Sequence, residues 1–303
     1  MQDRRDIDDA RQRDGAADRN ITSPAGHGAR ERDDQSRDPR DVATRCLDLP
    51  RGQDRELIRV RERTYELNGS ESRTLASVGT FRVVRTEDLR NPSDPLERRL
   101  KHLRDQGLIR SVSLGGRTRD VIVLTREGHD VLEARRREDA REPRQVFYEG
   151  LRKPREVTHD AALYRAYRRA SDRLREQGAD VRRVVLDYEL KREYQTFLQE
   201  CNRQEPAGDC RSRRSNEEVE RWAREHDLPY FDDRVHFPDI RIEYDDRDGH
   251  HRVEDIEVVT RNYRGTHGAS AARSGFTCYF LASGHGGRGR AGTRHAERIE
   301  DFL

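Results

Sequence analysis

The most regular pattern of apolar and polar positions lies in residues 85–125. Leu96, Leu100 and Leu103 recur at helical spacing and predict a helix with one apolar face, while charged residues, most of them basic, occupy the other positions. Gly107 follows as a residue that can end a helix in a left-handed conformation. The pattern therefore predicts a helix whose exposed face is basic.

A β-hairpin is predicted directly after this helix. Leu108 and Ile109 begin an alternating run, Gly115 and Gly116 favour a tight turn, and Val121–Leu124 returns as an apolar strand. A basic helix followed by a hairpin is the order of elements in a winged helix-turn-helix domain, where the helix enters the major groove of double-stranded DNA and the hairpin contacts the adjacent backbone. We therefore expect DNA contacts from the basic residues of both elements, which are Arg98, Arg99, Lys101, His102 and Arg104 in the helix and Arg117 and Arg119 in the hairpin.

Shorter patterns complete this N-terminal half. The suitable N-cap Ser70 precedes four apolar residues that share one helical face, Leu75, Val78, Phe81 and Val84. Thr86 and Thr125 are suitable N-caps for a short second helix and for a helix after the hairpin. The alternating segment from Arg55 to Glu66 is either a strand or an arm that precedes the domain. We expect the winged helix-turn-helix domain over residues 51–140 and a polar linker over 141–157.

The C-terminal half, residues 158–303, has a different order of elements. Periodicity and caps predict helices over 158–178 and 191–202 and after Ser215, and strands at 184–186, 237–244, 251–260 and 276–282. Residues 261–275 are either helix or loop, and a helix is expected at 293–303. This order predicts a small α/β domain with a mixed sheet, so the expected fold class is α+β in the first half and α/β in the second.

Composition limits how much of the chain can form a core. Charged residues make up 40% of the chain and hydrophobic residues 32%, and the mean hydropathy is −1.16. Residues 1–50 are rich in Arg and Asp without apolar periodicity, and predict a disordered charged tail. Basic and acidic residues number 61 and 59, so any attraction to DNA has to come from local patches.

Cysteine spacing and the lengths of the apolar runs argue against several classes of protein. The four cysteines form no CxxC pair, which argues against a disulfide framework and a zinc finger. No apolar run approaches the length of a membrane span, and the N-terminus is polar where a signal peptide is apolar. We expect a cytoplasmic bacterial protein without membrane contact.

Three acidic residues in the predicted sheet are candidates for catalysis. Asp255 and Glu257 point to the same side of one strand because alternate residues share a face, and Asp239 opens the strand paired with it. Carboxylates that converge from adjacent strands can bind Mg²⁺ or Mn²⁺, which activates water and stabilises phosphate charge. His159 can bring an imidazole beside them, although a histidine near a helix start is more often a surface or capping residue.

These motifs resemble two known families. Pro238-Asp239 followed by Asp255-Ile256-Glu257 resembles the restriction-endonuclease-like, PD-(D/E)xK fold. The span from Glu71 to the C-terminus resembles the replication-relaxation family of plasmid and conjugative-element proteins, which join a winged helix to a nuclease-like domain. The resemblance implies a role in replication, relaxation or transfer of a mobile element, double-stranded DNA as partner, and association with relaxase or replication proteins. It also implies Asp239 and Glu257 as metal ligands and Asp239, Asp255 and Glu257 as catalytic residues.

The nuclease pattern is incomplete in this chain. Val259 stands where the pattern has a lysine, so the cation has to come from Arg261 or Lys191, or the domain is a non-catalytic relic that holds DNA. The acidic residues can equally form the solvated face of a half-covered sheet. Winged helices also serve as protein-docking and dimerisation modules. There are therefore two alternative functions. The first is a metal-dependent endonuclease, and the second is a protein-interaction module or transcriptional regulator. We also expect that the protein can form a homodimer.

Overall fold

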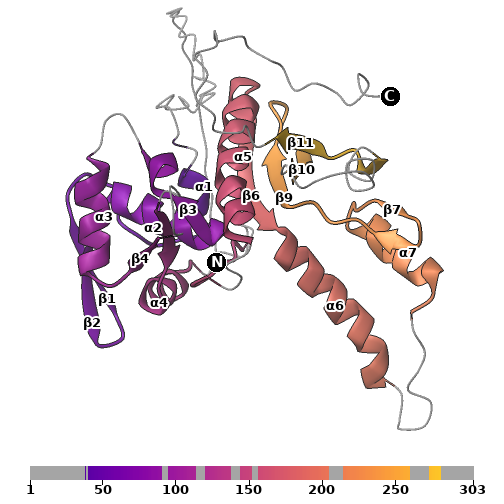
Figure 1. Ribbon diagram of the computed structural model, residues 1–303, viewed down its shortest axis with the longest axis horizontal. Coiled ribbons are helices and arrows are strands. Elements are labelled where there is room, and N and C mark those ends of the chain that lie inside the picture. The colour runs from indigo at the N-terminus through magenta and orange to yellow at the C-terminus, as the bar shows by residue number, and fades with distance from the viewer. Residues whose placement is uncertain are drawn as a thin grey trace, which may run out of the picture. The chain divides into compact units, whose positions relative to one another are not determined.

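The computed structural model describes residues 38, 40–90, 95–113, 120–137, 144–151, 156–204, 214–259 and 273–280, without the side chains of 201–204. This part is a mixed α and β structure with several small sheets (Figure 1), which confirms the mixed fold class. Within it, no helix is long and apolar enough to cross a membrane.

The N-terminal half combines a hairpin, a small antiparallel sheet and four α-helices. Its elements are α1 (Asp41–Thr44), β1 (Glu56–Val60), β2 (Arg63–Leu67), α2 (Gly69–Phe81), β3 (Val83–Arg85), the 3-10 helix η1 (Thr86–Leu89), α3 (Leu96–Asp105), β4 (Ile109–Val112), β5 (Val121–Leu124) and α4 (Arg126–Ala134). Strands β1 and β2 pair with each other, and the second sheet has the order β3-β5-β4. The segment from Arg55 to Glu66 is thus a hairpin.

Helix α3 agrees with its prediction, whereas helix α2 starts and ends earlier than predicted. Leu96, Leu100 and Leu103 of α3 are all buried, and Gly107 has the expected positive φ of 73°. Helix α2 begins earlier than predicted, because Asn68 and Glu71 form a reciprocal capping box. It also ends earlier, at Phe81, because the next residue adopts a φ of 63° that helical geometry does not allow and the chain continues as β3.

The C-terminal half is built on a four-stranded mixed sheet. Its elements are α5 (Val157–Glu176), β6 (Asp180–Leu186), α6 (Asp187–Gln204), α7 (Asn216–Glu225), β7 (Tyr230–Phe231), β8 (Arg234–Val235), β9 (Ile240–Asp245), β10 (His251–Val259) and β11 (Thr277–Phe280). The sheet order is β11-β10-β9-β6, in which β10 and β11 are parallel and the other pairs antiparallel. Strands β7 and β8 form a separate small hairpin.

Different helices pack against the two faces of this sheet. Ile240, Ile256 and Val258 belong to the same buried cluster as the apolar side chains of α5. Val185 belongs to a second cluster with residues of α6 and α7, including Trp222. The sheet therefore has α5 on one face and the α6–α7 segment on the other.

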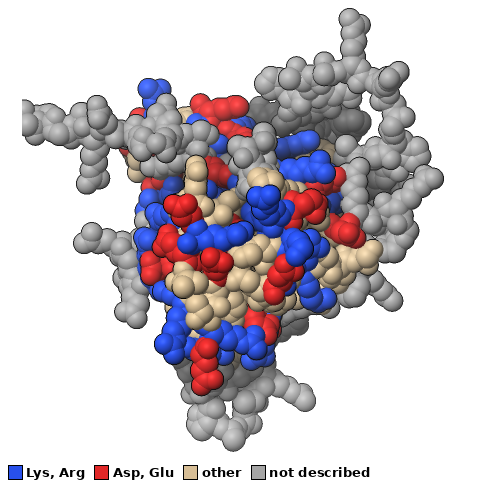
Figure 2. Space-filling model, turned by 90° about the vertical axis from the view of Figure 1, so that its left-hand side faces the viewer, with Lys and Arg blue, Asp and Glu red and all other residues tan. Residues whose placement is uncertain are grey.

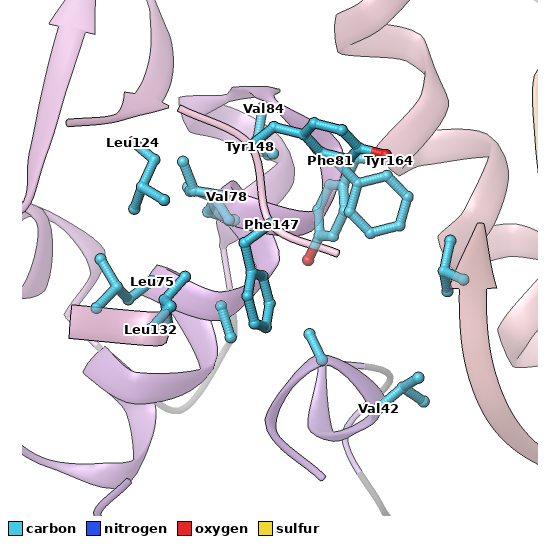
Figure 3. Packing of buried hydrophobic residues seen from close by; sticks show 14 of the residues in the cluster. Val42, Leu75, Val78, Phe81, Val84, Leu124, Leu132, Phe147, Tyr148 and Tyr164 are labelled. Carbon is cyan, nitrogen blue, oxygen red and sulfur yellow. The ribbon is translucent and has the colours of Figure 1, made fainter. Parts of the chain in front are cut away.

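The expected linker between the halves is part of a shared core. Phe81 of α2 packs against Tyr164 and Tyr167 of α5, with ring centroids 5.2 and 5.0 Å apart. Phe147, from the expected linker, lies beside these residues and is buried (Figure 3). The Gln145 amide donates to the carbonyl of Val184 at 2.8 Å and accepts from its N–H at 3.1 Å. The linker prediction is therefore wrong for residues 145–148, whose buried side chains join the two halves.

Residues 40–50, which belong to the expected disordered tail, are part of the folded structure. Val42, Ala43, Leu47 and Leu49 are buried in the main core, and Leu47 forms an isolated β-bridge with Arg136. These few apolar residues are spaced too irregularly to predict burial, and their contacts with α2 and β6 bury them. Residues 1–37 of the expected tail and the helix expected at 293–303 lie outside the described residues.

Candidate nucleic-acid interface and acidic site

The outward face of α3 carries three exposed cations. Arg98, Lys101 and Arg104 are exposed, on the side opposite the buried leucines. Lys101 Nζ lies 2.6 Å from Asp105 Oδ2 in an exposed ion pair, a kind of contact that contributes little stability and exchanges readily. Arg104 reaches Ser111 Oγ of β4 at 3.2 Å, so the helix face continues onto the β4–β5 hairpin. Figure 2 shows basic side chains on this side of the molecule interspersed with acidic ones.

Two of the predicted DNA contacts point into the protein instead. Arg99 is 3% exposed, and its guanidinium donates to Ser70 Oγ at 2.9 Å and to the Leu89 carbonyl at 2.8 Å. His102 Nδ1 lies 2.9 Å from Glu71 Oε1, beside the buried start of α2. Arg99 therefore joins α2, η1 and α3, and its prediction as a DNA contact is wrong. The position of His102 beside Glu71 likewise gives it an internal role.

The hairpin tip that carries Arg117 and Arg119 lies outside the described residues. Its base is described: the Thr86 N–H and hydroxyl both donate to the Asp120 carbonyl, at 3.2 and 3.0 Å. Asp120, the residue directly after this segment, is therefore held against η1.

Asp239 meets a histidine at the end of the sheet. Its Oδ2 accepts from the Val258 N–H at 2.8 Å and lies 3.1 Å from His159 Nε2, while His159 Nδ1 lies 3.5 Å from Asp160 Oδ1. Burial by itself lowers the pKa of His159, but the hydrogen bonds and charges of Asp160 and Asp239 outweigh it and raise this pKa to about 10. A protonated imidazole therefore links two carboxylates at neutral pH.

Asp255 has a structural partner. Arg241 Nε and Nη2 donate to its two carboxylate oxygens, both at 2.8 Å, and the same guanidinium donates to the carbonyls of His226 and Asp227. Arg241 is 6% exposed. The pair fixes the end of α7 to the sheet, so the catalytic assignment of Asp255 is wrong: both its oxygens are committed to a buried guanidinium.

Glu257 lies next to this pair on the same face of β10. It is 9% exposed and is paired in register with Cys278 of β11, whose thiol pKa is raised by burial and by the Glu257 charge. Ile240 is paired with Ile256, so one further step of the register sets Asp239 opposite Glu257. The structure thus brings these two predicted ligands to the same end of the sheet.

The donor set does not fit a catalytic Mg²⁺ or Mn²⁺ site. The predicted ligand Asp239 already accepts two hydrogen bonds through one oxygen, from a backbone N–H and a histidine whose charge opposes a cation. Lys191, a candidate replacement for the missing lysine, lies 2.6 Å from Asp187 Oδ2 in its own helix. The other candidate, Arg261, lies outside the described residues. We therefore derive no reaction step through a metal.

The sequence interpretation missed Arg82, which lies beside Asp160, one of the two carboxylates that contact His159. It occupies a strained backbone conformation, with φ 63° and ψ −50°, and its Nη1 is 3.8 Å from Asp160 Oδ2. Its guanidinium lies 5.9 Å from the ring centroids of Tyr148 and Tyr188. Burial, followed by the charge of Asp187, raises the pKa of Tyr148 to about 12. A charged residue inside the apolar run Phe81–Val84 was the available sequence signal.

A separate acidic group lies in the β9–β10 turn. Carboxylate oxygens of Asp246 and Asp248 and a ring nitrogen of His250 lie within 4.8 Å of one another, so the group has the composition of a cation site. Asp246 Oδ1 accepts from the backbone N–H groups of the other two residues, and these bonds lower the pKa of Asp246. Turn formation by itself explains the arrangement.

Searches of family models, curated proteins and solved structures found no match to the chain.

Proposed function

We propose that the protein binds double-stranded DNA by placing the exposed face of α3 in the major groove. The observation that supports this most directly is the row formed by Arg98, Lys101 and Arg104, exposed on a helix whose opposite face is anchored by buried leucines. The order α2, β3, η1, α3, β4 and β5, in which β4 and β5 pair antiparallel after the helix, supports the proposal of a winged helix-turn-helix domain.

We propose that the C-terminal sheet has a nuclease-like architecture without nuclease chemistry. Three antiparallel strands, a parallel fourth strand and the flanking helix α5 support the resemblance to the PD-(D/E)xK fold. The engagement of Asp255 by Arg241, and of Asp239 by His159, argues against catalysis. A role in the replication, relaxation or transfer of a mobile element follows from the family resemblance alone.

The test of DNA binding is a salt series with a fluorescent duplex of mixed sequence. Each phosphate contact adds about 0.9 to the slope of log affinity against log salt concentration. Arg98→Gln with Lys101→Gln should weaken binding, and flatten the slope to the extent that these cations contact phosphates. The matched control is Arg221→Gln with Arg224→Gln, which removes two exposed cations from α7. Equal binding by both double variants would exclude α3 as the contact, and absence of binding by the unaltered protein would favour a protein-interaction module.

The endonuclease alternative has its own test. Supercoiled plasmid is incubated with the protein and Mg²⁺, Mn²⁺ or EDTA, and nicking is followed on a gel. We expect no nicking. Nicking that requires the ion and disappears in Glu257→Gln would establish an endonuclease and refute the non-catalytic proposal.

A further inference from the structure

A groove lined by arginines lies between η1 and α5, away from the α3 face. Its volume is about 270 Å³, and its walls come from both halves of the chain. Its lining residues are Glu87, Asp88, Arg90, Arg165, Arg168, Arg169 and Asp172. The sequence interpretation assigned none of them to a site.

The carboxylates of the groove are already paired with particular arginines. Arg165 lies 2.9 Å from Asp88 Oδ1 and 3.2 Å from Glu87 Oε1, and these contacts raise the pKa of Arg165 despite its partial burial. Asp172 lies 3.8 Å from Arg175, which is outside the groove. Glu87 also lies 3.7 Å from Arg85, so the three carboxylates of the groove are paired with three arginines, of which Arg165 alone belongs to the lining.

The other three arginines of the groove have no carboxylate within ion-pair distance in the part of the chain that the structure describes. Arg168 donates to the Asp88 backbone carbonyl at 3.2 Å, which leaves its charge uncompensated. Arg169 lies 5.1 Å from the ring centroid of Tyr279, a contact that orients a guanidinium without neutralising it. Arg90 is exposed at the end of η1. The groove therefore presents three guanidinium groups that are not paired with its carboxylates, and their planar donor geometry matches phosphate oxygens.

The groove lies near the base of the hairpin that follows α3. Helix η1 forms one wall, and its Thr86 holds Asp120, the residue directly after segment 114–119. Helix α5 forms the other wall and packs beside β3, the strand before η1 (Figure 1). The groove is therefore linked through η1 to Asp120, the first described residue after segment 114–119.

We propose that the η1–α5 groove is a second phosphate-binding site, which holds the sugar-phosphate backbone of the duplex bound by α3. This inference rests on the proposed DNA binding. Arg90, Arg168 and Arg169 donate to phosphate oxygens, and the site extends the contact from the N-terminal half onto the C-terminal half.

The test compares the exposed arginines of the groove with exposed arginines elsewhere. Arg90→Gln with Arg169→Gln should flatten the slope of log affinity against log salt concentration by about 2, since two phosphate contacts are lost. The lysine variants of the same two positions keep the charges and should retain most of the slope. Circular dichroism verifies that each variant is folded.

The outcomes separate this site from the α3 proposal. If the glutamine variant of the groove has the slope of the Arg221→Gln, Arg224→Gln control while the α3 variant is weakened, the groove proposal is wrong and DNA binding by α3 stands. If the groove variant is weakened and the α3 variant is not, the groove binds DNA and the α3 proposal fails. If the unaltered protein does not bind the duplex, both are refuted.

Discussion

Replacement of Asp255 distinguishes a structural carboxylate from a catalytic one. Arg241 is 6% exposed, and in the Asp255→Ala variant its guanidinium loses both carboxylate bonds, although the two backbone carbonyls still accept from it. Loss of one partner of a buried ion pair typically costs 3–5 kcal/mol, because the remaining charge stays buried. Since Arg241 keeps two acceptors, we expect a loss near the lower limit, about 3 kcal/mol of the free energy of unfolding.

Urea unfolding at neutral pH measures this change with two probes. Trp222 is the only tryptophan in the sequence, and it stacks on His226, whose carbonyl accepts from Arg241. Its fluorescence therefore reports the attachment of α7, while circular dichroism reports the helices as a whole. We expect the fluorescence transition to shift at least as far as the dichroism transition. Asp172→Ala, at an exposed carboxylate, is the control and should change stability by less than about 0.5 kcal/mol. A loss below about 1 kcal/mol in Asp255→Ala would refute the structural role.

Three further predictions concern other buried polar groups. Arg99→Ala should lower the free energy of unfolding by about 2–3 kcal/mol, as buried acceptors lose a charged donor, and leave the salt dependence of DNA binding unchanged in the duplex assay. The His159 pKa of about 10 exceeds its unfolded value of 6.5, so its stabilising contribution is complete below pH 6.5 and is lost as the pH rises through 10. Urea titrations from pH 6 to 10 should therefore show stability falling more steeply in the unaltered protein than in His159→Gln. Gln145→Ala should cost about 2–4 kcal/mol in the same unfolding assay, because both backbone groups of Val184 lose a buried partner.

Local signals in the sequence were sufficient where the structure is decided locally. The spacing of the leucines in α3 and the glycine after it correctly predicted the buried face and the end of that helix. The same spacing also predicts that Arg99 is buried. It lies three residues after Leu96 and four before Leu103, so a helical wheel places it on the apolar face regardless of its charge. Arg99 was predicted to contact DNA because a charged residue was assumed to be exposed.

Other features depend on partners that the sequence does not identify. Asp255 is opposite Arg241 only in the register that the β9–β10 turn fixes, and a shift by one residue would turn every side chain of the strand to the other face. The burial of Leu47, Phe147 and Tyr148 depends on elements that are distant from them in the chain. The sequence offered His159 as an imidazole beside the acidic residues, but it did not identify Asp239 as the partner, because this contact joins residues 80 positions apart.

The shared core holds the two proposed phosphate-binding surfaces, the α3 face and the η1–α5 groove, in fixed positions relative to each other. Phe81 connects α2 to α5 through Tyr164 and Tyr167, and Arg165 connects α5 to η1 through Asp88. The α3 face and the η1–α5 groove are thus parts of one packed unit and not of two domains joined by a flexible linker. A duplex bound at α3 can therefore occupy the groove without a further loss of orientational freedom, whereas two tethered domains would have to be ordered on the DNA at a cost in affinity. Under the proposed binding, the core that merges the halves therefore favours a continuous contact with the DNA backbone.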